Sequence, residues 1–156
     1  MVHVMFVCTG NICRSPVAQG VFENVARREG LADKITVDAA GTHGFYHAGE
    51  PPDPRAQKSL ISRGIDISGQ RARLLDPEDC RRFDYILTMD EENYRAVSAL
   101  CRGNAVVRPF LNFVPDSPER EVHRGPDGFE HVIDLVEEAS EGLLDDVRAR
   151  HLTDRG

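Results

Sequence analysis

The sequence predicts an α/β fold with a four-stranded parallel sheet. Two observations lead to this prediction: apolar segments of strand length alternate with amphipathic segments of helix length, and the 156 residues include no stretch with the composition of an interdomain linker. Alternating strands and helices are typical of parallel sheets joined by right-handed crossovers. A chain of this length buries roughly 68–70% of its unfolded surface. We therefore expect residues 1–156 to form a single domain.

The first strand and helix are the clearest elements. Residues 2–7 form a nearly unbroken apolar run, as expected of a central parallel strand that is buried on both faces. Beyond Pro16, valine recurs every fourth residue from Val17 to Val25, and Gly30 follows. That spacing predicts a helix that the glycine ends. The segment is therefore a strand, a tight loop and a helix.

Further elements follow to the end of the chain. Short apolar runs predict three more strands, over residues 35–40, 83–89 and 105–109. A helix is expected over residues 55–63, closed by Gly64, and another over residues 90–100, which begin with acidic side chains. A long amphipathic helix is expected over residues 128–151, with Asp127 and Glu130 spaced as a capping box.

Composition excludes several classes of function. The net charge is −7, and residues 127–156 account for most of it with nine acidic and three basic side chains. No basic stripe is present, so nucleic acid is not an expected partner. The longest apolar run is far shorter than the ~18 residues that a membrane span needs, and no signal-peptide pattern opens the sequence. We therefore expect a cytoplasmic protein that does not associate with a membrane.

The cysteines suggest catalysis more than cross-linking. Four are present, Cys8, Cys13, Cys80 and Cys101, too few and too scattered for a disulfide framework. No Cys-x2-Cys pair occurs, so no structural zinc site is predicted. We expect reduced thiols and no metal or other cofactor, with at least one cysteine available for chemistry.

The loop after the first strand has the residues of a phosphate site. It reads Cys8-Thr9-Gly10-Asn11-Ile12-Cys13-Arg14-Ser15-Pro16. A short loop entering a helix can turn successive backbone N–H groups toward an anion, which the helix N-terminus also attracts. Gly10 and Asn11 tolerate the left-handed backbone angles that such a turn needs. Arg14 offers a planar fork for two phosphate oxygens.

The same loop would make Cys8 a nucleophile. Inward N–H groups, the helix dipole and the guanidinium all favour the thiolate, and Ser15 can donate a hydrogen bond to the sulfur. An isolated Cys-x5-Arg match has little value, and Ser15-Pro16 alone is an ordinary helix start. Their joint occurrence after a buried strand predicts an anion site. No Gly-Lys-Ser/Thr follows, so the loop is not a nucleotide P-loop.

Residues 7–16 resemble the signature of the low-molecular-weight protein tyrosine phosphatases. The resemblance continues through residues 37–42, 50–55, 83–90 and 125–130. It implies a three-layer fold with helices on both faces of the parallel sheet. It also implies metal-free hydrolysis of phosphotyrosine in a protein substrate, in two steps through a phosphocysteine at Cys8. Thr9, Gly10, Asn11, Ile12 and Cys13 would bind the phosphoryl group, or inorganic phosphate, and Arg14 would stabilise its transition state.

The resemblance extends to a few other positions. Tyr46 matches the aromatic residue that forms a wall of the substrate cleft, with Phe45 as the rival; stacking on the phenyl ring would select phosphotyrosine over phosphoserine. A half-buried loop aromatic without that role is the alternative. Cys13 matches the family's second loop cysteine, which can pair with Cys8 and protect it from oxidation. Ala39 and Gln70 occupy positions where familiar members have a serine and a histidine.

The general acid of the family is missing from the expected place. Members carry it in an Asp-Pro-Tyr-Tyr-type loop before the final helix, and here that loop is absent between Val122 and Gly125. Asp116 would supply the acid on a rival alignment, Asp127 is better explained as part of the capping box, and His123 could act near neutral pH. We assign no acid. A further alternative is that residues between Val122 and His123 are missing from the sequence. In that case the Cα atoms of these two residues would lie much further apart than the about 3.8 Å of bonded neighbours.

Two other functions remain alternatives. Arsenate reductases related to this family share the fold and loop, but need closely spaced further cysteines near position 80, where Cys80 stands alone. The Pro16 that follows Ser15 also differs from the glutamine usual in that group. A pseudo-phosphatase that binds phosphotyrosine without hydrolysing it is the other alternative, favoured by the missing acid.

Overall fold

The computed structural model describes residues 1–10, 14–43, 48–103, 105–114 and 128–152. Its strands are β1 (Val2–Cys8), β2 (Ile35–Gly41), β3 (Tyr85–Thr88) and β4 (Val106–Pro109). Its helices are α1 (Arg14–Arg28), α2 (Pro54–Ile61), α3 (Asp79–Arg82), α4 (Glu91–Leu100) and α5 (Gly128–His151), with a 3-10 helix over Phe110–Phe113. The described elements follow the predicted order.

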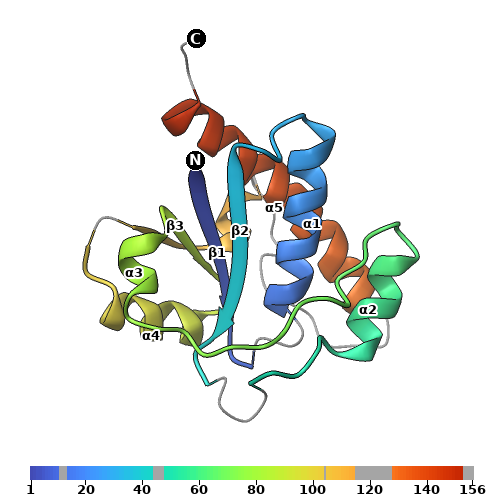
Figure 1. The fold of residues 1–156 in the computed structure, drawn as a ribbon, viewed down its shortest axis with the longest axis horizontal. Helices are drawn as coiled ribbons and strands as arrows, with labels where there is room; N and C mark the ends of the chain where they lie inside the picture. The colour runs from blue at the N-terminus through green and yellow to red at the C-terminus, as the bar shows by residue number, and fades with distance from the viewer. Residues whose placement is uncertain (11–13, 44–47, 104, 115–127, 153–156) are drawn as a thin grey trace.

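The strands form one parallel sheet in the order β2-β1-β3-β4. Helices α1, α2 and α5 lie on one side of it, and α3 and α4 on the other (Figure 1). The predicted three-layer α/β fold is confirmed. Because β1 is flanked by β2 and β3, its carboxyl end lies at the middle of the sheet edge where ligands bind in folds of this kind.

Several elements begin or end one or two residues away from their predicted bounds, and one helix was not predicted. Helix α1 begins at Arg14, two residues before the expected start, because Pro16 lacks only an N–H that the first helical turn leaves unbonded. Helix α3 was not predicted, and four residues are too few to show helical periodicity. The side chain of its first residue, Asp79, accepts a hydrogen bond from the N–H of Asp76 at 2.8 Å, just before the helix.

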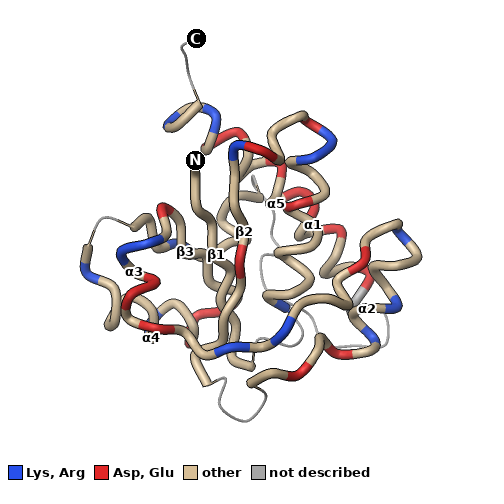
Figure 2. Tube along the Cα trace, in the orientation of Figure 1, with Lys and Arg blue, Asp and Glu red and all other residues tan. Residues whose placement is uncertain are grey.

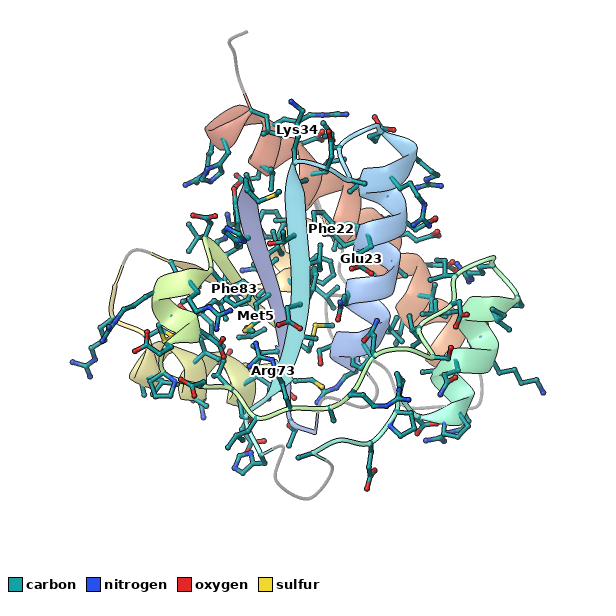
Figure 3. All side chains as sticks on the ribbon, viewed as in Figure 1. Met5, Phe22, Glu23, Lys34, Arg73 and Phe83 are labelled. Atoms are coloured by element: carbon teal, nitrogen blue, oxygen red, sulfur yellow. A yellow bond between two sulfur atoms is a disulfide. The ribbon has the colours of Figure 1, made fainter. Side chains whose placement is uncertain are left out.

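The larger core lies between the sheet and helices α1 and α5. Phe6 of β1 contacts Phe22 of α1 and Phe110 edge to face, with ring centroids 5.9 and 4.8 Å apart. Alternate residues of β1, among them Met5, point into a smaller core on the other side of the sheet. Figure 3 shows Phe22 on the α1 side and Met5 and Phe83 on the opposite side. The apolar run is therefore buried on both faces, as predicted.

A disulfide joins the two helices that cover the smaller core. Cys80 of α3 is bonded to Cys101, directly after α4, with Cα atoms 5.2 Å apart. The prediction of reduced thiols at these positions is wrong in this structure. Both helices pack on the same face of the sheet, which brings together two cysteines 21 residues apart in the sequence. Sequence spacing alone did not reveal that proximity.

The surface carries charges of both signs. Figure 2 shows Lys and Arg scattered among Asp and Glu, with acidic residues along much of α5. Arg63, after α2, contacts Glu130, Asp134 and Glu137 of that helix at 2.8, 3.1 and 3.2 Å. No helix in the described part of the chain is long and apolar enough to cross a membrane.

Candidate active site

The site begins where β1 ends. Cys8 is the last residue of the strand and pairs in register with Gly41 of β2. The carbonyl of Cys8 accepts a hydrogen bond from the Thr42 N–H, and the carbonyl of Thr9 accepts one from the His43 N–H, both at 2.9 Å. The segment over residues 8–14, here called the phosphate loop, is thus held on the β2 side by its first two carbonyls.

The Cys8 sulfur lies beside the first turn of α1. Its Sγ is 3.1 Å from the Oγ of Ser15, the second residue of that helix. Cys8 is 2% exposed and Ser15 is fully buried. The hydroxyl is therefore placed to donate to the sulfur, as the sequence predicted, and the helix N-terminus stabilises negative charge there.

Arg14 is oriented by a carboxylate that lies between the neighbouring strand β3 and helix α4. Its Nη1 donates to the Oδ2 of Asp90 at 2.8 Å. Asp90 follows β3 and caps α4, with its Oδ1 accepting from the Asn93 N–H at 2.8 Å. Burial would raise the pKa of Asp90, but the hydrogen bonds from Asn93 and Arg14 outweigh it and hold that pKa below its ordinary value. Asp90 is thus ionised and fixes the guanidinium.

A second residue of α4 contacts the phosphate loop. The Nδ2 of Asn93 donates to the Oγ1 of Thr9 at 3.2 Å. Neither Asp90 nor Asn93 is among the site residues that the sequence predicts. The available signal was topological: Asp90 follows a strand adjacent to β1, and the carboxyl ends of neighbouring parallel strands lie at the same edge of the sheet.

These contacts define what the site can do. It combines a buried thiol, a hydroxyl in contact with its sulfur, the N-terminus of a 15-residue helix and a guanidinium held by a carboxylate. Each favours a negatively charged group above the sulfur. The arrangement is suited to binding a tetrahedral oxyanion and transferring it to Cys8.

Comparison with known proteins identifies the family. Residues 3–152 match the family model described as low molecular weight phosphotyrosine protein phosphatase. The chain belongs to that family. It is therefore a phosphatase, and the family membership that the sequence resemblance implied is confirmed.

Individual relatives of this phosphatase span nearly its whole length. A putative low molecular weight protein-tyrosine-phosphatase of Synechocystis is 43% identical over 148 residues, covering 90% of this chain and 93% of the relative. The crystal structure of YfkJ from Bacillus subtilis has a TM-score of 0.89 at 35% identity, covering 97% of each chain. A product-state mimic of a protein tyrosine phosphatase from Entamoeba histolytica has a TM-score of 0.90 at 34% identity, covering 99% of this chain and 100% of the other.

Gln70 retains one contact with the start of α1 in this phosphatase. Its Nε2 donates to the Pro16 carbonyl at 3.3 Å. Gln70 occupies the position expected for a histidine, and its side chain makes a hydrogen bond to the first turn of α1 from that position. Ala39, at the position expected for a serine, is buried in β2.

Several predicted site residues lie outside the described part of the chain. They are Asn11, Ile12 and Cys13 of the phosphate loop, Tyr46 with its rival Phe45, the acid candidates Asp116, His123 and Asp127, and the junction over residues 122–125. The described predictions, Cys8, Thr9, Gly10, Arg14 and Ser15, lie together at the carboxyl end of β1 and the start of α1. Among the described residues, no three His, Cys, Asp or Glu side chains are arranged to hold a metal ion.

Proposed function

We propose that this phosphatase hydrolyses phosphotyrosine in protein substrates through a phosphocysteine at Cys8. The observation that carries the proposal is the 3.1 Å contact between the Cys8 Sγ and the Ser15 Oγ at the start of α1. A buried hydroxyl directed at a sulfur, next to a helix N-terminus, is the environment of a nucleophilic thiolate. The names of the relatives, which are protein-tyrosine-phosphatases, support the substrate class.

In the first step the Cys8 thiolate attacks phosphorus. An S–P bond forms, the bond between phosphorus and the tyrosyl oxygen breaks, and that oxygen leaves with a proton from an acid that we do not assign. The inward N–H groups expected over residues 9–13 bind the non-bridging oxygens, and Arg14, held by Asp90, stabilises the charge that develops on them.

In the second step water attacks the phosphorus of the phosphocysteine and gives a proton to the conjugate base of the unassigned acid. The S–P bond breaks, inorganic phosphate forms, and the electron pair returns to the Cys8 sulfur. The Ser15 hydroxyl donates to the departing thiolate, which makes the sulfur a better leaving group. No metal or other cofactor takes part in either step.

The substrate class, partners and location follow from the same proposal. Tyr46 would stack on the phenyl ring of the substrate, and neither nucleic acid nor a membrane would be a partner. We infer that residues 1–156 act as one domain in the cytoplasm, where a nucleophilic thiol remains reduced.

The Cys80–Cys101 disulfide is unusual for that compartment. Thiol alkylation in intact cells, followed by mass spectrometry, tests whether it persists there.

Trapping the intermediate tests the mechanism directly. Rapid mixing of the protein with p-nitrophenyl phosphate and quenching in acid should yield a phosphoryl group on the peptide that contains Cys8. Cys8→Ser should abolish hydrolysis but still bind phosphate, whereas Arg14→Ala should lose both hydrolysis and binding. Hydrolysis that persists in Cys8→Ser would overturn the proposal. Phosphate binding without any turnover in the wild-type protein would support the pseudo-phosphatase alternative.

The arsenate reductase alternative has a separate test. Cys80 would have to relay a disulfide from Cys8, but it is bonded to Cys101 on the opposite side of the sheet from α1. We therefore expect no arsenate reduction in the presence of thioredoxin and its reductase. Steady reduction that Cys80→Ser abolishes would establish that activity.

A further inference from the structure

We propose that Asn93 is a positioning residue that fixes the conformation of Thr9 and, through it, the start of the phosphate loop. The inference rests on the proposed function, because the conformation of this loop matters only if it presents an oxyanion to Cys8. Asn93 lies in the first turn of α4 and is 84 residues from Thr9 in the sequence. Neither the motif nor its spacing indicates a connection between them.

The first observation is that Thr9 is held from two sides. Its carbonyl accepts the His43 N–H at 2.9 Å on the β2 side. Its side-chain hydroxyl accepts the Asn93 Nδ2–H at 3.2 Å on the α4 side. Thr9 follows the nucleophile directly, so these two hydrogen bonds restrain the backbone where the phosphate loop leaves β1. A loop that binds an oxyanion by its N–H groups depends on that restraint for their direction.

The second observation is that Asn93 is an unfavourable residue for stability at its position. The side chain is fully buried, and its Oδ1 accepts no hydrogen bond in the described part of the chain. A buried acceptor without a donor destabilises a fold. Val97, one turn further along α4, is equally buried and packs in the smaller core. An apolar residue at position 93 would avoid the unsatisfied oxygen, but it could not donate to Thr9.

The third observation is that the start of α4 reaches two points of the phosphate loop, Thr9 near its beginning and Arg14 at its end. The Asn93 N–H donates to the Asp90 Oδ1 at 2.8 Å, and the Asp90 Oδ2 accepts from Arg14 at 2.8 Å. The first turn of α4 therefore sets Thr9 through the Asn93 side chain and Arg14 through Asp90. Loss of the amide would release the Thr9 end and leave the Arg14 end in place.

Asn93→Ala tests the inference, with Val97→Ala as the matched control from the same buried face of α4. We expect Asn93→Ala to lower kcat/KM for p-nitrophenyl phosphate about tenfold, the value of one hydrogen bond. The competitive inhibition constant of inorganic phosphate should rise by a similar factor. Val97→Ala should lower the melting temperature and leave kcat/KM per folded molecule unchanged. If Asn93 were only structural, the two variants would lose activity in proportion to their loss of stability.

A double-mutant cycle with Thr9 identifies the hydrogen bond as the cause. Thr9→Val removes the hydroxyl and keeps the shape, whereas Thr9→Ser keeps the hydroxyl and should restore most of the activity that Thr9→Val loses. The kcat/KM of the double variant Asn93→Ala/Thr9→Val should be no lower than that of the less active single variant. Wild-type values of kcat/KM and of the phosphate inhibition constant in Asn93→Ala, or additive losses in the cycle, would overturn the inference. Absence of hydrolysis in the wild-type protein would instead count against the proposed function, and phosphate titration would then compare Asn93→Ala with Val97→Ala.

Discussion

Replacing Ser15 with alanine removes the hydrogen bond on which the proposed chemistry depends. The Ser15 Oγ lies 3.1 Å from the Cys8 Sγ, in a fully buried position where water cannot replace it. A hydrogen bond to a charged group is worth about 1.5–3 kcal/mol. That energy corresponds to a decrease in rate of about 10- to 150-fold, at 1.36 kcal/mol for each factor of ten.

The decrease should fall on the second step. Charge develops on sulfur as the thiolate leaves phosphorus, so loss of the Ser15 donor raises the barrier to hydrolysis of the phosphocysteine. In the first step the thiolate loses charge, and the same substitution removes stabilisation from the reactant. We therefore expect kcat to fall about 10- to 150-fold, while phosphocysteine accumulates. Stopped-flow measurement with p-nitrophenyl phosphate should show a burst of nitrophenol followed by slow turnover.

Ser140→Ala is the matched control for Ser15→Ala. Ser140 is also a fully buried serine, but it lies in α5 and its hydroxyl has no hydrogen-bond partner in the described part of the chain. Its replacement should leave turnover unchanged and keep or slightly raise stability. A Ser15→Ala protein with normal kcat and no burst would refute the proposed role of Ser15. An equal loss of activity in both variants would show that the effect is not specific to the sulfur.

Three further predictions concern stability and substrate choice. Breaking the Cys80–Cys101 disulfide, by a reductant or by Cys101→Ser, should lower the free energy of unfolding by about 3 kcal/mol in urea titrations, from its 21-residue separation. Burial, and then the hydrogen bond from the Tyr85 hydroxyl to Asp146, raise the pKa of Tyr85 above its ordinary value of 10.0. Tyr85→Phe should therefore cost about 1–3 kcal/mol at neutral pH, a difference that shrinks as pH rises above 10.0, where the unfolded tyrosine ionises. Without an assigned acid, aryl phosphates should turn over more slowly as the pKa of their phenol rises.

Each of these predictions has a contradicting result. An unchanged urea midpoint after verified reduction would show that the disulfide does not stabilise the fold. A stability difference between wild type and Tyr85→Phe that is constant up to strongly alkaline pH would argue against the shifted tyrosine. Rates that are independent of the leaving phenol, together with a single acidic limb in the pH profile, would reveal a working general acid.

Local patterns were sufficient to predict β1 and α1. The apolar run over residues 2–7 requires burial on both faces, and the valine spacing after Pro16 defines a helical face, so both signals lie within one stretch of chain. The Cys8–Ser15 contact follows from the same stretch, because the two side chains are separated only by the turn between strand and helix.

The contacts that complete the site depend on strand order, which no local pattern encodes. Asp90 reaches Arg14 only because β3 lies beside β1, and Asn93 reaches Thr9 only because α4 follows from that strand. The Cys80–Cys101 disulfide likewise depends on two helices that share one face of the sheet. Such pairings are fixed by the packing of the whole chain.

The burial of Cys8 limits which inhibitors can act on it. Because only 2% of the residue is exposed, a bulky maleimide or aromatic electrophile should react with the sulfur more slowly than a small oxidant or a compact tetrahedral anion such as vanadate. A covalent drug for this enzyme should therefore carry its reactive atom at the tip of a phosphate-sized head.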